Sequence, residues 1–148
     1  MLQVKDALTA ARIRLLTIGV DRRLTEAASL LADGGRRMVV VCNNAGAMVG
    51  VLTRGDIVRQ IGDCTGCACM AECAYVMSAD VISCRAEQWL RDVWLMMNER
   101  GLVDVPIINN EGEPIGLLTA RDALELLLSE TLYEEKIVID YITRVGYH

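Results

Sequence analysis

The sequence predicts a mixed α/β fold made of two β-α-β-β-α units, and three observations support this fold class. Residues 43–56 align without a gap on residues 109–122, and both segments contain the pattern N-N-x-G-x-x-x-G-x-L-T-x-x-D. In each copy, Asn and Gly separate two apolar runs, which is typical of a β-hairpin turn. In each copy, apolar residues at helical spacing follow the second run. A duplicated structural unit accounts for all three observations.

The first copy follows a series of shorter predicted elements. Residues 4–14 carry apolar side chains at helical spacing, so an N-terminal helix leads into the first unit. A short strand is expected at residues 15–18, and a helix is expected at residues 24–31. Gly34 and Gly35 end this helix.

The predicted hairpin of the first unit joins residues 38–42 to residues 48–52. Thr53 then stands where the N-cap of a helix is expected, and Asp56 follows three residues later. A helix that begins there completes the β-α-β-β-α order of the first unit.

The second unit repeats this order, and Pro106 favours the start or the edge of its strand. Residues 132–142 extend as a further amphipathic helix that ends near Gly146, and its apolar stripe needs a partner inside the chain or in a second copy. The other predicted elements are strands at residues 81–84, 105–108 and 115–118, a helix at residues 90–99, and a helix from Arg121.

The composition excludes several classes of protein. Apolar runs such as residues 38–42 are far shorter than the roughly 20 residues of a membrane-spanning helix, and the N-terminus lacks the apolar core of a secretory signal. The net charge of −5 gives no basic face for nucleic acid. We therefore expect a cytoplasmic protein with no nucleic-acid or membrane partner. The sequence contains no Walker loop, Ser-His-Asp set or paired carboxylates, so we expect no enzymatic activity.

The two Thr-x-x-Asp motifs, Thr53 to Asp56 and Thr119 to Asp122, are the main candidates for a ligand site. Each motif opens a helix, where unpaired backbone N–H groups and the helix dipole favour an anion. The Thr hydroxyl can donate to a phosphate oxygen, and the Asp carboxylate can accept from both hydroxyls of a ribose. The alternative is that each motif only caps its helix, as Thr-x-x-Glu does. Duplication within matching units favours the ligand site.

Four motifs stand out along the chain: G-V-L-T-R-G-D at 50–56, G-L-L-T-A-R-D at 116–122, V-P-I-I at 105–108 and M-S-A-D-V-I-S-C at 77–84. Through these motifs the chain resembles, over nearly its whole length, tandem cystathionine β-synthase (CBS) domains, the pair often called a Bateman module. The resemblance implies two units packed through their sheets about a pseudo-twofold axis, with two clefts for adenosine-containing ligands such as AMP, ADP or ATP. It also implies a regulatory, energy-sensing homodimer that acts on a separate protein.

The resemblance also implies roles for pairs of residues, one from each unit. The pairs are Asp56 and Asp122 for the ribose hydroxyls, Thr53 and Thr119 for the phosphates, Arg54 and Arg121 for positive charge, the backbone at Thr17-Ile18 and Ser83-Cys84 for adenine, and the side chains of Val39 and Val105 beside adenine.

The two clefts are expected to differ in charge. Many relatives carry a basic residue before the second hairpin, whereas this chain has Asp104 there, and a carboxylate repels phosphates. Arg36 and Arg37 precede the corresponding strand of the first unit, where they either favour a phosphate or form a solvated turn. We therefore expect the cleft with Thr53 and Asp56 to be the more favourable for a phosphate.

Four of the six cysteines lie between the two units in the pattern C-x2-C-x-C-x3-C. Closely spaced thiolates can hold zinc or an iron–sulfur cluster, although this spacing fits neither template. The alternative is that these thiols pack as small apolar side chains, which is also the interpretation for Cys42 and Cys84. The four cysteines are Cys64, Cys67, Cys69 and Cys73.

The expected organisation is a first CBS unit with the N-terminal helix (1–62), a Cys-rich linker (63–76), a second CBS unit (77–131) and a C-terminal helix (132–148). The expected function is regulation through binding of an adenosine nucleotide. The alternatives are a thiol-based metal or redox sensor and a dimerisation scaffold that binds no ligand.

Overall fold

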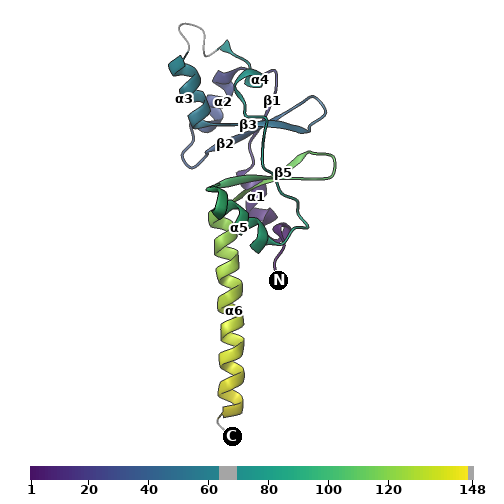
Figure 1. The fold of residues 1–148 in the computed structure, drawn as a ribbon, viewed down its shortest axis with the longest axis vertical. Coiled ribbons are helices and arrows are strands. Elements are labelled where there is room, and N and C mark those ends of the chain that lie inside the picture. Colours follow the sequence, from purple (N-terminus) through teal and green to yellow (C-terminus); the bar gives the residue numbers. More distant parts are fainter. Residues whose placement is uncertain (64–69, 147–148) are drawn as a thin grey trace.

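The structure is a computed structural model that describes residues 1–63 and 70–146. Its body holds two small β-sheets, one in each unit, and one long helix projects from the second unit toward the C-terminus (Figure 1). In chain order the elements are a 3-10 turn (Val4–Ala7), α1 (Leu8–Arg14), β1 (Thr17–Gly19), α2 (Leu24–Leu31), β2 (Met38–Cys42), β3 (Met48–Thr53), α3 (Arg54–Asp63), α4 (Cys73–Val76), α5 (Leu90–Arg100), β4 (Asp104–Ile108), β5 (Pro114–Thr119) and α6 (Ala120–Gly146).

The first unit contains a three-stranded sheet in the order β1-β2-β3, covered by α2 and α3 (Figure 1). Strands β1 and β2 are parallel, and β2 and β3 form the predicted antiparallel hairpin. Gly46 closes the hairpin turn at φ 87°, a conformation that glycine adopts without steric cost. Alternate strand residues such as Val39, Val41 and Leu52 are fully buried against Leu24 and Ala27 of α2.

The second unit contains the predicted hairpin of β4 and β5, but the prediction of a strand at residues 81–84 is wrong. Only Cys84 pairs with the sheet, through a parallel bridge to Ile107. The Cys84 N–H donates to the Pro106 carbonyl (2.9 Å), and the Ile108 N–H donates to the Cys84 carbonyl (2.9 Å). In a parallel pair of strands, the next hydrogen bond would run from the N–H of residue 106 to the Ile82 carbonyl. Residue 106 is a proline, which has no N–H. The pairing therefore stops after one bridge.

The N-terminal helix packs on the second unit, although it precedes the first unit in sequence. Helix α1 lies against β5, and Val4, Ala7 and Ala11 belong to the same buried cluster as Leu118. A Cβ atom at Gly116 would lie 2.9 Å from the Ala11 Cβ, so glycine is required for this close approach. Helix α1 thus contributes to the core of the second unit, and the predicted division of the chain at residue 62 stays a prediction.

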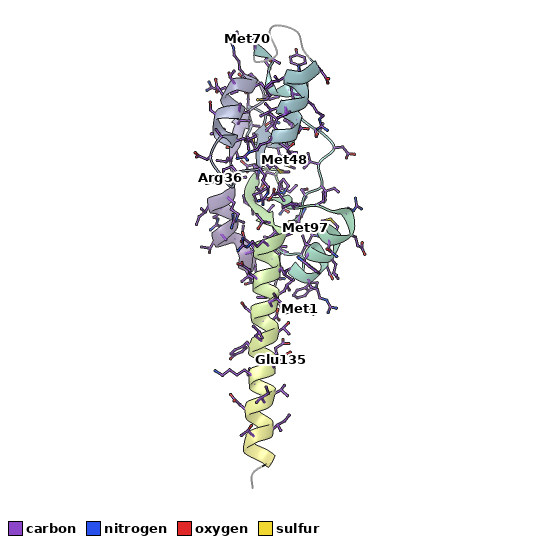
Figure 2. The ribbon with its side chains drawn as sticks, turned by 90° about the vertical axis from the view of Figure 1, so that its left-hand side faces the viewer. Met1, Arg36, Met48, Met70, Met97 and Glu135 are labelled. Carbon is purple, nitrogen blue, oxygen red and sulfur yellow. The ribbon has the colours of Figure 1, made fainter. Side chains whose placement is uncertain are left out.

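Residues from Ala120 to Gly146 form one continuous helix, where the sequence predicted a helix from Arg121 followed by a further helix. The C-terminal part of α6 extends beyond the body, where Glu135 lies (Figures 1 and 2). Its apolar side chains Leu132 and Ile139 are 65% and 61% exposed. The homodimer that the exposed stripe suggests stays a prediction. Among the described residues, no helix is long and apolar enough to cross a membrane.

Candidate functional site

Two clefts lie between the units, and each combines the Thr of the Thr-x-x-Asp motif of one unit with the loop before the hairpin of the other. The Thr119 cleft has a volume of about 370 Å³ and the Thr53 cleft about 350 Å³. The Thr119 cleft is lined by Ala10, Ile13, Arg14, Gly34, Gly35, Arg36, Arg37, Met38, Asp104, Leu117 and Thr119. The Thr53 cleft is lined by Arg37, Met38, Thr53, Arg54, Gly55, Gly101, Leu102, Val103 and Asp104.

Arg37 and Asp104 form an ion pair that borders both clefts. The Arg37 Nε donates to Asp104 Oδ2 (3.0 Å), and its Nη2 donates to Oδ1 (2.8 Å). The side chain of Asp104 is only 6% exposed, whereas that of Arg37 is 47% exposed. The hydrogen bond to Asp104 raises the pKa of Arg37, and burial opposes this shift. Because Arg37 balances the carboxylate, Asp104 repels a phosphate less than its isolated charge would suggest.

The first motif forms a reciprocal helix cap. The Thr53 N–H donates to Asp56 Oδ2 (2.9 Å), and the Asp56 N–H donates to Thr53 Oγ1 (3.3 Å). The other carboxylate oxygen of Asp56 accepts from Arg59 Nη2 on the same helix (2.5 Å). Both oxygens of this 9% exposed carboxylate are thus engaged within α3 and its cap.

The second motif differs from the first in how its carboxylate is used. The Asp122 N–H donates to Thr119 Oγ1 (3.0 Å), as in the first motif. The carboxylate instead receives both hydrogen bonds from Arg14, the last residue of α1: from Nε to Oδ2 (2.5 Å) and from Nη2 to Oδ1 (3.0 Å). The side chain of Asp122 is 12% exposed and that of Arg14 is 42% exposed. Asp122 is thus linked to the Thr119 cleft through Arg14, which lines it, although Asp122 itself is not one of the lining residues.

Of the remaining predicted arginines, Arg36 and Arg121 lie in different places from those that the repeat suggests, whereas Arg54 lies in the expected cleft. Arg36 lies at the junction between the two halves of the body (Figure 2), in the Thr119 cleft, and donates to the Ile13 carbonyl (3.0 Å). Arg54 lines the Thr53 cleft and donates to the carbonyls of Leu31 (2.9 Å) and Asp33 (2.8 Å). Arg121 is outside both clefts and pairs with Glu125 (3.2 Å). The positive charge thus gathers around Thr119 rather than Thr53.

The residues predicted to flank adenine do not line either cleft. Val39, Cys84 and Val105 are buried in the two cores, with exposures of 0%, 2% and 0%. Thr17 and Ile18 line a separate hollow at the edge of the first sheet. Ser83 is half-buried just before the single bridge of Cys84.

Sequence reasoning missed Arg14, and no local signal marks it. Its partner Asp122 is 108 residues away in the chain. The contact between them exists only because α1 crosses to the second unit. Ile13 and Ala10 line the Thr119 cleft for the same reason.

The candidate metal ligands Cys64, Cys67 and Cys69 lie outside the described residues. Cys73 is described: its side chain is buried, and its thiol lies 3.9 Å from the Arg23 carbonyl. Burial, with a smaller contribution from Glu26, raises the pKa of Cys73 and disfavours the thiolate that binds metal or reacts. Within residues 1–63 and 70–146, no three potential ligands lie close enough together to hold a metal ion.

Burial raises the pKa of Cys84 to about 12, from 9.0 for an unperturbed thiol. Below pH 9, folded and unfolded states are both protonated at this thiol, so its contribution to stability is complete. Above pH 9 only the unfolded state ionises, so stability should fall until the pH reaches about 12. Denaturant unfolding across this range should show a shallower decline for Cys84→Val than for the unaltered protein. Equal slopes in the two proteins would contradict the assignment.

The sequence is similar to one family of domains and to two curated proteins. The model of the CBS domain matches residues 4–63 and 73–129. The uncharacterized protein MJ1404 of Methanocaldococcus jannaschii is 24% identical over 105 residues, which cover 71% of this chain and 25% of that protein. The uncharacterized protein MK0525 of Methanopyrus kandleri is 24% identical over 127 residues, which cover 84% of this chain and 65% of that protein. The chain therefore spans less than two thirds of either relative.

Solved structures share the fold. The structure of CBSX2 in complex with AMP has a TM-score of 0.75 at 20% identity, covering 88% of this chain and 99% of that chain. The CBS domain pair of MJ0100, in complex with 5′-methylthioadenosine and S-adenosyl-L-methionine, has a TM-score of 0.72 at 19% identity, covering 88% and 98%. At these identities, the likeness concerns the arrangement of the backbone.

Proposed function

Since this chain belongs to the CBS domain family, whose model matches it over residues 4–63 and 73–129, we propose that it is a regulatory module that binds an adenosine nucleotide in the Thr119 cleft. The structures of CBSX2 and MJ0100 were solved with adenosine-containing ligands, which supports this class of ligand. The module regulates a separate protein or another part of a longer chain, and it has no catalytic role of its own.

The observation that carries the choice of cleft is the concentration of three guanidinium groups around Thr119. Arg14, Arg36 and Arg37 line a cleft of about 370 Å³, which is within the roughly 300–1,000 Å³ of ordinary small-molecule sites. Guanidinium groups bind phosphate through two parallel hydrogen bonds. AMP, ADP and ATP all carry the phosphate that such a cleft would hold.

The roles of individual residues follow from what each atom can offer. Asp122 accepts hydrogen bonds from the ribose hydroxyls, because its carboxylate is held by the Arg14 side chain and not by a backbone cap, and a side chain can turn away. The Thr119 hydroxyl and the arginines bind the phosphate. The Thr53 cleft is the weaker site, because Asp56 is engaged by the Thr53 N–H and by Arg59. This choice reverses the preference that the sequence suggested.

Isothermal titration calorimetry with AMP, ADP and ATP tests the proposal. At least one of these nucleotides should bind the unaltered protein, and Asp122→Ala should weaken binding by about tenfold or more, because hydrogen bonds to a charged group are lost. The matched variant Asp56→Ala should change affinity by less than about threefold. Circular dichroism spectra and thermal unfolding of both variants control for loss of the fold.

Two results would overturn parts of this proposal. Binding that depends on Asp56 and is unchanged by Asp122→Ala would move the ligand to the Thr53 cleft. A heat signal absent for all three nucleotides would reject nucleotide binding and leave the scaffold alternative.

A further inference from the structure

We propose that Arg14 selects among adenosine ligands, so that the Thr119 cleft accepts those that carry a phosphate and discriminates against those that do not. This inference rests on the proposed binding of an adenosine ligand in that cleft. It concerns a residue of the N-terminal helix that lies outside both Thr-x-x-Asp motifs.

In the structure, Arg14 occupies the acceptor atoms that a ribose would need. Its guanidinium donates to both carboxylate oxygens of Asp122, at 2.5 and 3.0 Å. A ribose that binds both oxygens along the edge that faces Arg14 must therefore displace Arg14 from at least one of these hydrogen bonds. The corresponding carboxylate of Asp56 has no contact with α1, so this arrangement is specific to the second motif.

Separating Arg14 from Asp122 costs free energy, and the net cost depends on the incoming ligand. The side chain of Asp122 is 12% exposed, and a carboxylate at this depth is poorly solvated once its cation leaves. Ribose hydroxyls supply hydrogen bonds but no positive charge. Arg14 is itself more exposed, at 42%, so its guanidinium has room to turn into the cleft that it lines.

A phosphate on the ligand compensates for this release, because a guanidinium binds phosphate in the same two-pronged geometry as it binds a carboxylate. Arg14 would exchange Asp122 for the phosphate while the ribose hydroxyls take its place on Asp122. Arg36 and Arg37 line the same cleft and add to the attraction. A neutral ligand such as 5′-methylthioadenosine offers Arg14 no new anion.

The test compares AMP with 5′-methylthioadenosine by calorimetry on the unaltered protein, Arg14→Ala and Arg14→Lys. The unaltered protein should prefer AMP by about tenfold or more, the value of one charge-assisted contact. Arg14→Ala should reduce this preference by about threefold or more, mainly because 5′-methylthioadenosine binds more tightly once Asp122 is free, and Arg36 and Arg37 account for the preference that remains. Arg14→Lys keeps the charge without the two-pronged geometry, so its preference should lie between the two.

Arg12→Ala is the matched control, since Arg12 is an exposed arginine on the same helix and should leave the preference for AMP unchanged. Equal affinities of the unaltered protein for both ligands, or a preference of unchanged size in Arg14→Ala, would overturn the role of Arg14 and leave nucleotide binding intact. If neither ligand binds the unaltered protein, the proposed function fails and this inference fails with it.

Discussion

Gly50→Val should lower the free energy of unfolding by about 3 kcal/mol or more, because it forces a side chain into a space that the backbone fills. A Cβ atom at Gly50 would lie 2.6 Å from Met77 Sδ and 2.8 Å from the Ser78 carbonyl oxygen. The flexible Met77 side chain can move aside, but Ser78 is held by two backbone hydrogen bonds with Val51, at 3.0 and 2.9 Å. Chemical denaturation followed by circular dichroism measures the change.

Gly62→Ala is the control for this substitution. Among the described residues, and apart from the backbone of helix α3 in which it lies, no atom is within 4 Å of a Cβ at Gly62. Replacing a glycine inside a helix with alanine should raise stability by roughly 0.5–1 kcal/mol. A Gly50→Val variant that loses no more than about 1 kcal/mol would show that the strand and the segment at Ser78 separate easily.

This steric requirement explains a part of the repeat that the sequence alone left unassigned. Gly50 and Gly116 both begin the repeated G-x-L-T pattern, and each allows another segment to approach its strand. At Gly50 that segment is the chain at Ser78, and at Gly116 it is helix α1. The duplicated glycine therefore serves packing, whereas the duplicated Thr and Asp belong to the motifs that border the clefts.

Local sequence patterns predicted the helices and strands that are determined by residues close together in the chain. The two hairpins have Asn and Gly in their turns, and helices α2 and α5 have apolar residues at helical spacing, so their positions could be derived from neighbouring residues. The strand expected at residues 81–84 failed because its pairing depends on an N–H that Pro106, in another segment, does not have. That information lies outside any local window.

The site was harder to predict than the fold for the same physical reason. The repeat suggested that Arg36 and Thr53, which lie in one unit, would share a cleft. The fold instead sets the loop of one unit against the motif of the other, so Arg36 lines the cleft of Thr119. Arg14 could not be assigned until the path of α1 was known. Sequence reasoning found the types of residue in the clefts, and tertiary structure decided which of them meet.

The path of α1 leads to the second large effect: Ala11→Asp should lower the free energy of unfolding of the second unit by more than about 3 kcal/mol. Ala11 is 1% exposed, and its Cβ lies where a Cβ on Gly116 would be only 2.9 Å away. A carboxylate there would be buried against β5 without a cation. Intrinsic tryptophan fluorescence during denaturation measures the effect, because both tryptophans, Trp89 and Trp94, belong to the second unit.

Thr9→Asp distinguishes this cause from a general effect of charge on the helix. Thr9 is exposed on α1, and an acidic residue near the N-terminus of a helix is neutral or slightly stabilising, so its fluorescence transition should match that of the unaltered protein. If α1 packed on the unit that follows it in sequence, Ala11→Asp would leave the tryptophan transition in place and unfold only the first unit. A shifted tryptophan transition in Ala11→Asp alone is expected instead, because Val4, Ala7 and Ala11 complete the core beneath β5.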